Sequence, residues 1–202
     1  MTKVKMCGIK REEDIFAVNE IRPDYIGFIF FAKSKRYVSP KQADILKKLL
    51  DKNIKTVGVF VDEDINTVAK LLNCGTIDVA QLHGNEDDEY IIRLKAETNK
   101  PIIKAFRILS EQDAEYAQKS IADMILLDAG AGDGKVFDWS LVQKVKRPYF
   151  LAGGLNPENV RDALQKIQPY ALDVSSGIET GGLKDAEKMK IFMDIVRKEE
   201  KE

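Results

Sequence analysis

The sequence has few cysteines, a single histidine and no surplus of either charge. Two cysteines among 202 residues, Cys7 and Cys74, cannot form a disulfide framework and indicate a reducing compartment. The 32 Lys and Arg residues nearly balance 33 Asp and Glu residues, which excludes a broad basic surface for nucleic acid and an acidic disordered tail. No apolar run approaches the roughly 18 residues of a membrane span, and the N-terminal residues lack a signal-peptide core. We therefore expect a cytoplasmic globular protein.

The length of the chain and the spacing of its apolar runs favour one α/β domain. A chain of 202 residues, 44% of them apolar, can bury a substantial core without cross-links. The expected strands begin 21 to 31 residues apart, so each interval has room for one helix and two short loops. We expect strands at Val4–Cys7, Tyr25–Phe30, Thr56–Val61, Val79–Leu82, Ile102–Phe106, Met124–Leu127, Tyr149–Leu151 and Leu172–Val174.

Amphipathic segments separate these strands, and residues that favour helix N-termini precede them. Ser39 before Pro40 is a typical helix start, and Asn156 before Pro157 repeats the pattern. The last segment places Met189, Phe192, Met193 and Val196 on one helical stripe. We expect further helices to begin at Asp62, Asn85, Ser110 and Asp138.

Eight strands that alternate with helices, without a linker or a change in composition, predict a parallel sheet. Eight units favour closure into a (β/α)₈ TIM barrel that spans residues 1–202 as a single domain, although the chain is short for that fold. The alternative is an open doubly wound sheet. It is disfavoured because GAGDGK at residues 130–135 matches neither the dinucleotide-binding glycine pattern nor the P-loop.

The carboxyl ends of the expected strands carry residue types that their starts lack. Glycines, hydroxyl groups or titratable groups stand at or just beyond these ends: Cys7, Gly8, Ser34, Lys35, Arg36, His83, Gly84, Arg107, Asp128, Gly153, Gly154, Ser175, Ser176 and Gly177. Active sites of barrels lie at this end of the strands. This asymmetry is the strongest indication of function in the sequence.

The segments after the seventh and eighth strands predict a phosphate site. Gly153, Gly154 and Gly177 expose backbone N–H groups without a side chain in the way, beside the hydroxyl groups of Ser175 and Ser176. Barrels commonly bind phosphate with these two loops. Tight turns alone would also account for the glycines.

Cys7 and Asp128 form the candidate acid–base pair. A cysteine accepts a proton only as a thiolate and an aspartate donates one only when protonated, so the two need pKa shifts in opposite directions. A lone cysteine is more often a small buried apolar residue. Asp128 follows an apolar run, where an unpaired carboxylate is costly.

Other polar residues suggest ligand binding rather than metal binding. His83 is a candidate site residue, although a structural role is commoner for a lone histidine. One histidine, with Cys74 expected to pack away from the rim, argues against a metal site. Arg36 and Arg107 are candidates for binding a carboxylate, and a solvent-exposed position is the alternative for each.

Together these motifs resemble the phosphoribosylanthranilate isomerase family over essentially the whole chain. The matching segments, in order, are KMCGIK, DYIGFIFFAKSKRYVS, VGVFV, QLHG, LLDAGAGDGKVFDW, FLAGGLNPENV and LDVSSGIET. Two segments depart from the family pattern: the compact GAGDGK after strand six, and Gly181-Gly182-Leu183-Lys184-Asp185, where the family often has Pro-Gly-x-Lys-Asp.

The resemblance implies a (β/α)₈ enzyme of tryptophan biosynthesis that uses no metal or organic cofactor. Its reaction is the Amadori rearrangement of N-(5-phosphoribosyl)anthranilate to 1-(2-carboxyphenylamino)-1-deoxyribulose 5-phosphate. It implies Cys7 as general base and Asp128 as general acid. It also implies substrate binding by Arg36, with His83 a further candidate, and phosphate binding by Gly153, Gly154, Ser175, Ser176 and Gly177.

Three alternatives compete with this function. A histidine-pathway aldose–ketose isomerase is usually built on two aspartates, which Cys7 fits poorly, and a metal-dependent epimerase is disfavoured by the single histidine. A barrel that only binds a phosphorylated ligand would not need both Cys7 and Asp128. We expect a small phosphosugar–anthranilate substrate, no nucleic acid or membrane partner, and a monomer or homodimer.

Overall fold

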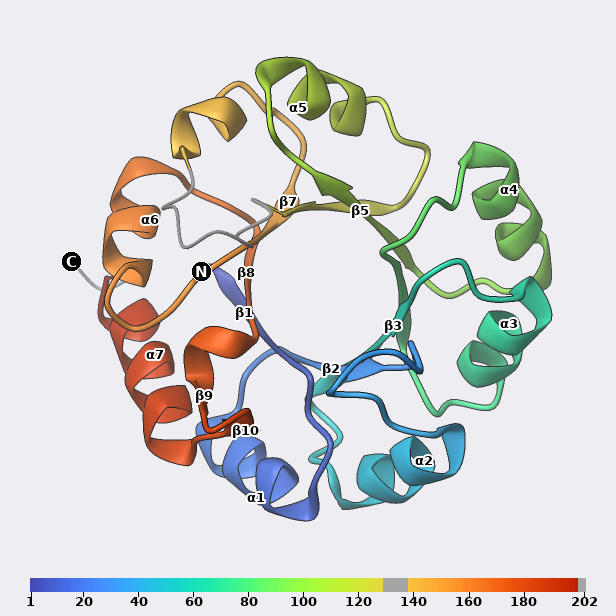
Figure 1. Ribbon diagram of the computed structural model, residues 1–202, viewed down its shortest axis with the longest axis horizontal. Helices are drawn as coiled ribbons and strands as arrows, with labels where there is room; N and C mark the ends of the chain where they lie inside the picture. Colours follow the sequence, from blue (N-terminus) through green and yellow to red (C-terminus); the bar gives the residue numbers. More distant parts are fainter. Residues whose placement is uncertain (129–137, 200–202) are drawn as a thin grey trace.

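In the computed structural model, which describes residues 1–128 and 138–199, eight parallel strands close into a barrel in sequence order. The hydrogen-bonded register runs from β1–β2 around to β7–β8 and closes between β8 and β1, where Lys5 pairs with Asp173. The helices form a ring outside the strands (Figure 1). The predicted (β/α)₈ barrel is confirmed, and the open sheet is excluded.

The elements alternate along the chain as follows: β1 (Lys3–Cys7), α1 (Glu12–Ile21), β2 (Tyr25–Ile29), α2 (Pro40–Leu49), β3 (Lys55–Phe60), α3 (Ile65–Asn73), β4 (Val79–Leu82), α4 (Asp88–Glu97), β5 (Ile102–Arg107), α5 (Glu111–Gln118), β6 (Met124–Asp128), the 3₁₀ helix η1 (Trp139–Val142), β7 (Tyr149–Ala152), α6 (Val160–Lys166), β8 (Ala171–Val174), the 3₁₀ helix η2 (Ser176–Ile178), β9 (Glu179–Thr180), β10 (Leu183–Lys184) and α7 (Ala186–Glu199). Every barrel strand lies within one residue of its predicted bounds.

Two hydrophobic cores stabilise this arrangement. One fills the space between the strands and the surrounding helices, and α7 contributes Met189, Phe192, Met193 and Val196 to it, as its stripe predicted. The smaller core lies inside the barrel and includes Val57, Val79, Ile103, Ala105, Leu126, Phe150, Ala152 and Ala171. Inward and outward positions alternate along each strand, so every strand is buried on both faces.

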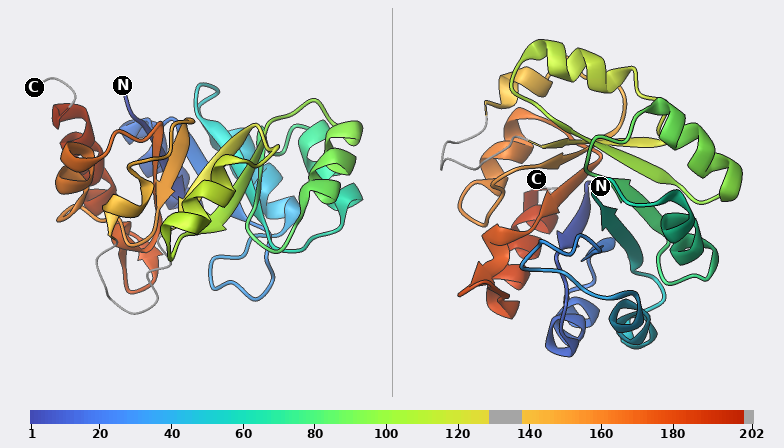
Figure 2. Two further views of the ribbon diagram at one scale, coloured as in Figure 1. Left: turned by 90° about the horizontal axis from the view of Figure 1, so that it is seen from above. Right: turned by 45° about the vertical axis from the view of Figure 1, so that its right-hand side comes forward.

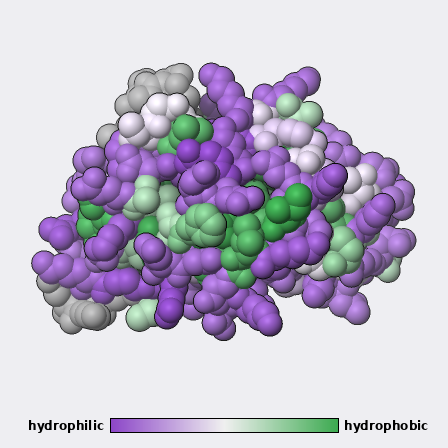
Figure 3. All heavy atoms as spheres, turned by 90° about the horizontal axis from the view of Figure 1, so that it is seen from below, coloured by the Kyte–Doolittle hydropathy of each residue, from purple (hydrophilic) through white to green (hydrophobic). Residues whose placement is uncertain are grey.

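The outer surface follows from the amphipathic helices. In Figure 3, which views the molecule from the side of α1 and α2, hydrophilic residues dominate and apolar patches lie between them. Exposed apolar side chains on these two helices include Phe16, Ile45 and Leu49. None of the helices in the described part of the chain is long and apolar enough to cross a bilayer.

The two ends of the barrel carry different segments. The N-terminus lies at one end, and the loop that joins β2 to α2 extends from the other (Figure 2, left). Because all eight strands run parallel, their carboxyl ends gather at the end with the β2–α2 loop. The residues expected to carry chemistry are thereby brought to the same rim.

Three of the predicted helix starts follow the expected capping chemistry, and three do not. Ser39 and Ser110 cap α2 and α5 by accepting hydrogen bonds from Gln42 N–H and Asp113 N–H. Asp138 caps η1, a 3₁₀ turn where a longer helix was expected, and the Asn156 side chain accepts N–H bonds in the turn before α6. Asp62, Asn85 and Asn156 were wrong: the caps of α3, α4 and α6 are Asp64, Asp87 and Asn159.

Glu86 explains why Asn85 does not begin α4. Instead of lying in the first helical turn, the Glu86 side chain is buried, with its carboxylate 2.8 Å from Lys104 Nζ. The same carboxylate accepts hydrogen bonds from Asp62 N–H and Gly84 N–H, which joins the loops after β3 and β4. Burying this carboxylate delays the helix by three residues.

The two segments that depart from the family pattern differ in what the structure shows. GAGDGK lies outside the described residues. The second segment forms a two-stranded antiparallel sheet in which β9 and β10 pair Glu179 with Lys184 and Thr180 with Leu183. This hairpin returns the chain towards the barrel before α7 begins.

Candidate active site

The carboxyl ends of the strands surround a cavity of about 470 Å³. Seven of the nine expected site residues line it: Cys7, His83, Asp128, Gly153, Gly154, Ser175 and Ser176. Arg107 lines it as well, whereas Arg36 and Gly177 do not. A cavity of about 490 Å³ at the opposite end is lined by Met1, Thr2, Leu164, Gln168, Pro169, Tyr170 and Glu199 and has no comparable group of polar residues from several strand ends. The first cavity is therefore the candidate active site.

Cys7 is the last residue of β1, and glycines make room for it. Its side chain points towards Gly27 of β2, where a Cβ atom would lie 2.7 Å from the Cys7 Sγ. Gly8 then turns with a φ of 85°, a conformation that favours glycine. Ser175 Oγ donates a hydrogen bond of 3.1 Å to the Cys7 carbonyl, which joins the ends of β1 and β8. The sulfur is thus held at a fixed place in the cavity wall.

Charged groups surround the Cys7 thiol. Burial raises the pKa of the thiol, the Lys5 ammonium opposes that rise, and the Asp173 carboxylate adds to it. Lys184 also opposes the rise. Burial therefore favours the neutral thiol of Cys7, and nearby positive charge favours its ionisation.

Lys5 and Asp173 form a buried ion pair that we did not predict from the sequence. Lys5 Nζ lies 2.9 Å from both carboxylate oxygens of Asp173, and the Lys5 side chain has no exposed surface. The sequence does indicate that Lys5 lies on the same side as Cys7, because it precedes Cys7 by two residues and alternate residues of a strand share a face. The same rule places Gln81 with His83, and Asp173 with Ser175.

His83 lies between Gln81 and Asp128. Its Nε2 atom is 3.3 Å from Asp128 Oδ2, and its Nδ1 atom is 3.1 Å from Gln81 Nε2. The Gln81 amide can donate to Nδ1 in the tautomer that carries its proton on Nε2, the atom that faces Asp128. Among the described residues, Gln81 Oε1 is a buried polar atom without a hydrogen-bond partner. The histidine links the ends of β4 and β6 and orients the Asp128 carboxyl.

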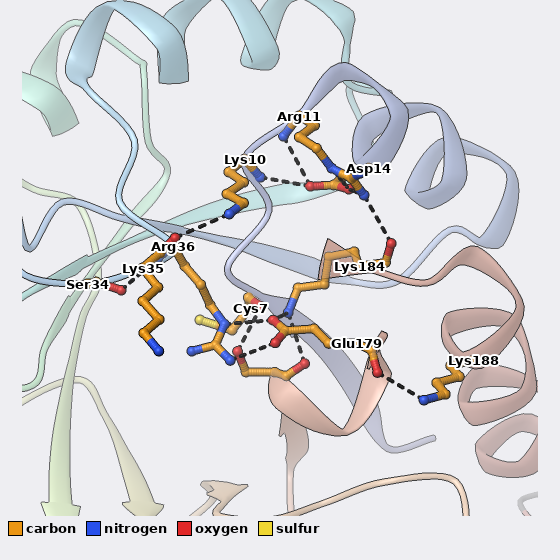
Figure 4. A network of polar contacts seen from close by, with 11 residues as sticks. Cys7, Lys10, Arg11, Asp14, Ser34, Lys35, Arg36, Glu179, Lys184 and Lys188 are labelled. Carbon is orange, nitrogen blue, oxygen red and sulfur yellow. Dashed lines mark hydrogen bonds and ion pairs between the residues drawn. The ribbon is translucent and has the colours of Figure 1, made fainter. Parts of the chain in front are cut away.

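Arg36 is held at the rim by Glu179. Its Nε and Nη2 atoms donate to the two Glu179 oxygens at 2.6 and 2.7 Å, and Lys184 Nζ lies 2.7 Å from the same carboxylate (Figure 4). Although burial acts in the opposite direction, Arg36 and Lys184 lower the pKa of Glu179 to about 2. Burial lowers the pKa of Lys184, and Glu179 opposes that change. Sequence reasoning missed Glu179 and Lys184, which the β9–β10 hairpin brings to Arg36.

The loops after β7 and β8 contain the glycines expected to bind phosphate. Gly153 and Gly154 line the cavity with φ angles of 99° and 68°, a conformation that few other residues adopt. Gly177 has a different role, because a Cβ atom there would overlap the Leu155 carbonyl. It lets the two loops pack against each other, and Ser175 and Ser176 remain in the cavity wall.

Two expectations concern residues away from the cavity. We expected Cys74 to pack in the core, and this prediction was wrong. The residue is exposed at the end of α3, with its Sγ 3.2 Å from Thr76 Oγ1. Within residues 1–128 and 138–199, no group of three or more His, Cys, Asp or Glu side chains is arranged to hold a metal ion. Lys104 and Glu86 support the loop that carries His83 but do not line the main cavity.

Comparisons with known proteins agree on one family. Residues 4–195 match the family model described as N-(5'phosphoribosyl)anthranilate (PRA) isomerase. The chain is 45% identical over 202 residues to the N-(5'-phosphoribosyl)anthranilate isomerase of Endomicrobium trichonymphae, covering 98% of this chain and 99% of that protein. The phosphoribosyl anthranilate isomerase structure from Thermotoga maritima superposes with a TM-score of 0.90 at 38% identity, covering 98% of this chain and all of that one. A structure of such an enzyme with reduced 1-(o-carboxyphenylamino)-1-deoxyribulose 5-phosphate has a TM-score of 0.88 at 37% identity, with 98% and 100% covered.

Proposed function

Because the chain belongs to the phosphoribosylanthranilate isomerase family, we propose that its rim cavity isomerises the family's substrate with Cys7 as general base and Asp128 as general acid. The protein is an isomerase of tryptophan biosynthesis that acts on N-(5'-phosphoribosyl)anthranilate. The single observation that supports the assignment of roles is that one cavity joins Cys7 at the end of β1 to Asp128 at the end of β6.

Asp128 begins the proposed Amadori rearrangement. Its carboxyl proton passes to the furanose ring oxygen while the bond from C1′ to that oxygen breaks. The anthranilate nitrogen supplies the electron pair for a C1′=N bond, which leaves a cationic Schiff base and an open chain. The His83 Nε2 atom at 3.3 Å orients the carboxyl for this transfer.

Cys7 completes the rearrangement. Its thiolate removes the C2′ proton, and the released electron pair forms a C1′=C2′ bond while the imine nitrogen becomes neutral. The resulting enol-amine tautomerises to the ketone 1-(2-carboxyphenylamino)-1-deoxyribulose 5-phosphate. Positioned proton transfers of this kind accelerate a reaction by about 10²–10⁴-fold each.

The two ends of the substrate would bind on opposite sides of this pair. We assign the phosphate to the loops of Gly153, Gly154, Ser175, Ser176 and Gly177, because the first four of these residues line the cavity and Gly177 lets the two loops pack against each other. We assign the anthranilate carboxylate to Arg36. Its Nε and Nη2 atoms bind Glu179, so the remaining nitrogen, Nη1, is the donor that would meet the substrate.

The remaining features of the proposal concern the protein as a whole. We propose that residues 1–202 function as one catalytic domain without metal or organic cofactor, because proton transfer and positioning account for each step above. The free thiols of Cys7 and Cys74 suit a reducing cytoplasm. We expect a monomer or a homodimer, and light scattering on the purified protein measures this oligomeric state.

The anthranilate fluorophore gives the test. Phosphoribosylanthranilate is generated in situ, and the loss of its fluorescence is followed with the wild-type protein and with Cys7→Ala. We expect loss with the wild type and none above background with the variant. Fluorescence that persists with the wild type, while inorganic phosphate still binds, would move the function to another sugar phosphate. Equal loss with both proteins would remove Cys7 from the reaction.

A further inference from the structure

Lys5 is a lysine in the interior of the barrel. Its side chain has no exposed surface, and its ammonium lies 2.9 Å from each oxygen of Asp173. The two residues are also direct partners in the hydrogen-bonded register of β1 and β8, so the backbone fixes their separation. Although burial acts against it, the Asp173 carboxylate raises the pKa of Lys5, which keeps the ammonium charged. The barrel interior therefore holds a Lys5–Asp173 ion pair at this level.

Stability alone does not account for this pair. Removing two charges from water costs several kcal/mol per ion, and well-packed apolar side chains of similar volume often serve equally well. Neighbouring inward positions show that the barrel accepts such side chains, since Val57, Val79 and Ile103 fill its core. An ion pair in this layer needs a further explanation.

The position of Lys5 relative to Cys7 supplies one. The two residues are two positions apart on β1, so both side chains point into the barrel and Lys5 lies directly beneath the cysteine. The Lys5 ammonium is close enough to the sulfur to lower the pKa of Cys7 against the larger effect of burial. Asp173 lines the cavity together with Cys7, which extends the pair to the cavity floor.

We propose that Lys5, anchored by Asp173, is a positioning residue whose ammonium allows Cys7 to ionise to the thiolate that its role as a base requires. The inference deepens the function proposed above and rests on the assignment of Cys7. Lys5 touches no reacting atom of the substrate in this scheme. It acts through the sulfur by balancing the charge that appears when the thiol loses its proton.

Other charges also face the sulfur, and their signs make the proposal specific. Lys184 on β10 and Arg36 after β2 favour the thiolate from the rim, whereas Asp173 on β8 opposes it from below. Removing the Lys5 charge should therefore disfavour the thiolate. Neutralising Asp173 should favour it, because the Lys5 charge is then uncompensated.

Thiol alkylation measures this property without any substrate. In a Cys74→Ser background, the rate of Cys7 modification by iodoacetamide is followed by mass spectrometry between about pH 6 and pH 10. We expect Lys5→Met to slow alkylation near pH 8 by about tenfold or more and to move the titration to higher pH. Lys5→Arg, which keeps the charge, should restore much of the rate, and Asp173→Asn should exceed the parent rate.

Controls separate the effect from damage to the fold. Lys104→Met removes another buried lysine, which pairs with Glu86 away from Cys7, and should lower stability without moving the alkylation profile. Lys5→Met combined with Asp173→Asn avoids an unpaired buried carboxylate and should still alkylate slowly. Circular dichroism and thermal melting establish that each variant is folded.

The outcomes distinguish this inference from the proposed function. An alkylation profile that is unchanged in both Lys5 variants, single and double, would overturn the inference even if the isomerase assay succeeds. A profile that depends on Lys5 in a protein without isomerase activity would support the inference for the thiol and refute the reaction. In the active enzyme, Lys5→Met should lower kcat with little change in KM, and higher pH should restore part of the loss.

Discussion

Glu179 binds Arg36 through two hydrogen bonds, 2.6 Å from Nε and 2.7 Å from Nη2. Such paired bonds fix the plane of the guanidinium as well as its position. The Glu179 side chain is itself held by Lys184 at 2.7 Å and is 8% exposed. The group assigned to the substrate carboxylate is therefore oriented by a second carboxylate before any substrate arrives.

Replacing Glu179 with Gln should weaken substrate binding. The amide keeps the size of the side chain but loses the charge that orients Arg36, so we expect KM to rise by about tenfold and kcat to stay within about threefold. Steady-state fluorescence kinetics measure both constants. Glu111→Gln, which removes the partner of exposed Lys144, is the matched control and should change neither. A KM that Glu179→Gln leaves unaltered would show that Arg36 needs no such orientation, or binds no carboxylate.

Glu179 should also contribute to the pH dependence of stability. Its pKa in the folded protein is about 2, below the usual value of 4.5, so the folded state binds this proton less readily than the unfolded state. The contribution is complete above about pH 4.5 and is lost as the pH falls towards 2.

Urea unfolding at several pH values tests this expectation. The difference in unfolding free energy between the wild type and Glu179→Gln should be largest at neutral pH and should shrink through the acidic range. A difference that stays constant between neutral pH and about pH 3 would mean that the carboxylate gains nothing from Arg36 and Lys184.

Asp128→Asn should lower kcat by about 10²–10⁴-fold, because an amide cannot supply the acidic proton that opens the ring. His83→Asn removes the Nε2 group that lies 3.3 Å from Asp128 and should cost less, about tenfold. Single-turnover fluorescence decay measures the chemical step directly. Binding of inorganic phosphate serves as the control, since both variants should retain it. Activity of Asp128→Asn within about tenfold of the wild type would contradict its role as the acid.

The sequence predicted the eight barrel strands within one residue, because strands buried on both faces are apolar at nearly every position. It also predicted which strand ends meet, since parallel strands share one rim. Three of its helix starts were wrong, and for Asp62 and Asn85 the reason is a polar side chain with a tertiary partner. Asp62 accepts a hydrogen bond from Asn85 Nδ2 instead of capping α3, and buried Glu86 pairs with Lys104.

Charged residues inside the barrel were harder to predict. Lys5 shares the inward face with Cys7, so the alternation of side chains along the strand could have identified it. We did not predict it, because we considered only the residues at the strand ends. Glu179 is different, because its partner Arg36 is 143 residues away and depends on the path of the β9–β10 hairpin. No local pattern encodes that contact.

Gly27 provides a test of whether the position of the Cys7 sulfur matters beyond stability. In Gly27→Ala, the new Cβ atom would lie 2.7 Å from Sγ and 3.1 Å from the Cys7 Cα, so the cysteine must move within the cavity wall. Gly58→Ala is the matched control, because its Cβ would meet Ile77 at 2.6 Å and Phe60 at 2.9 Å in the outer core, away from the cavity. Both variants should lose about 1–3 kcal/mol of stability through overpacking.

Only Gly27→Ala should also change the chemistry. A displaced sulfur loses its alignment with the C2′ proton, and a misplacement of about 1 Å can cost roughly 10²-fold in rate. We therefore expect kcat, measured per folded molecule after thermal melting, to fall at least about tenfold for Gly27→Ala and to stay near the wild-type value for Gly58→Ala. Equal kcat values for the two variants would show that the reaction tolerates movement of Cys7. A base that must reach one carbon-bound proton does not tolerate such movement, so this result would contradict the role of Cys7.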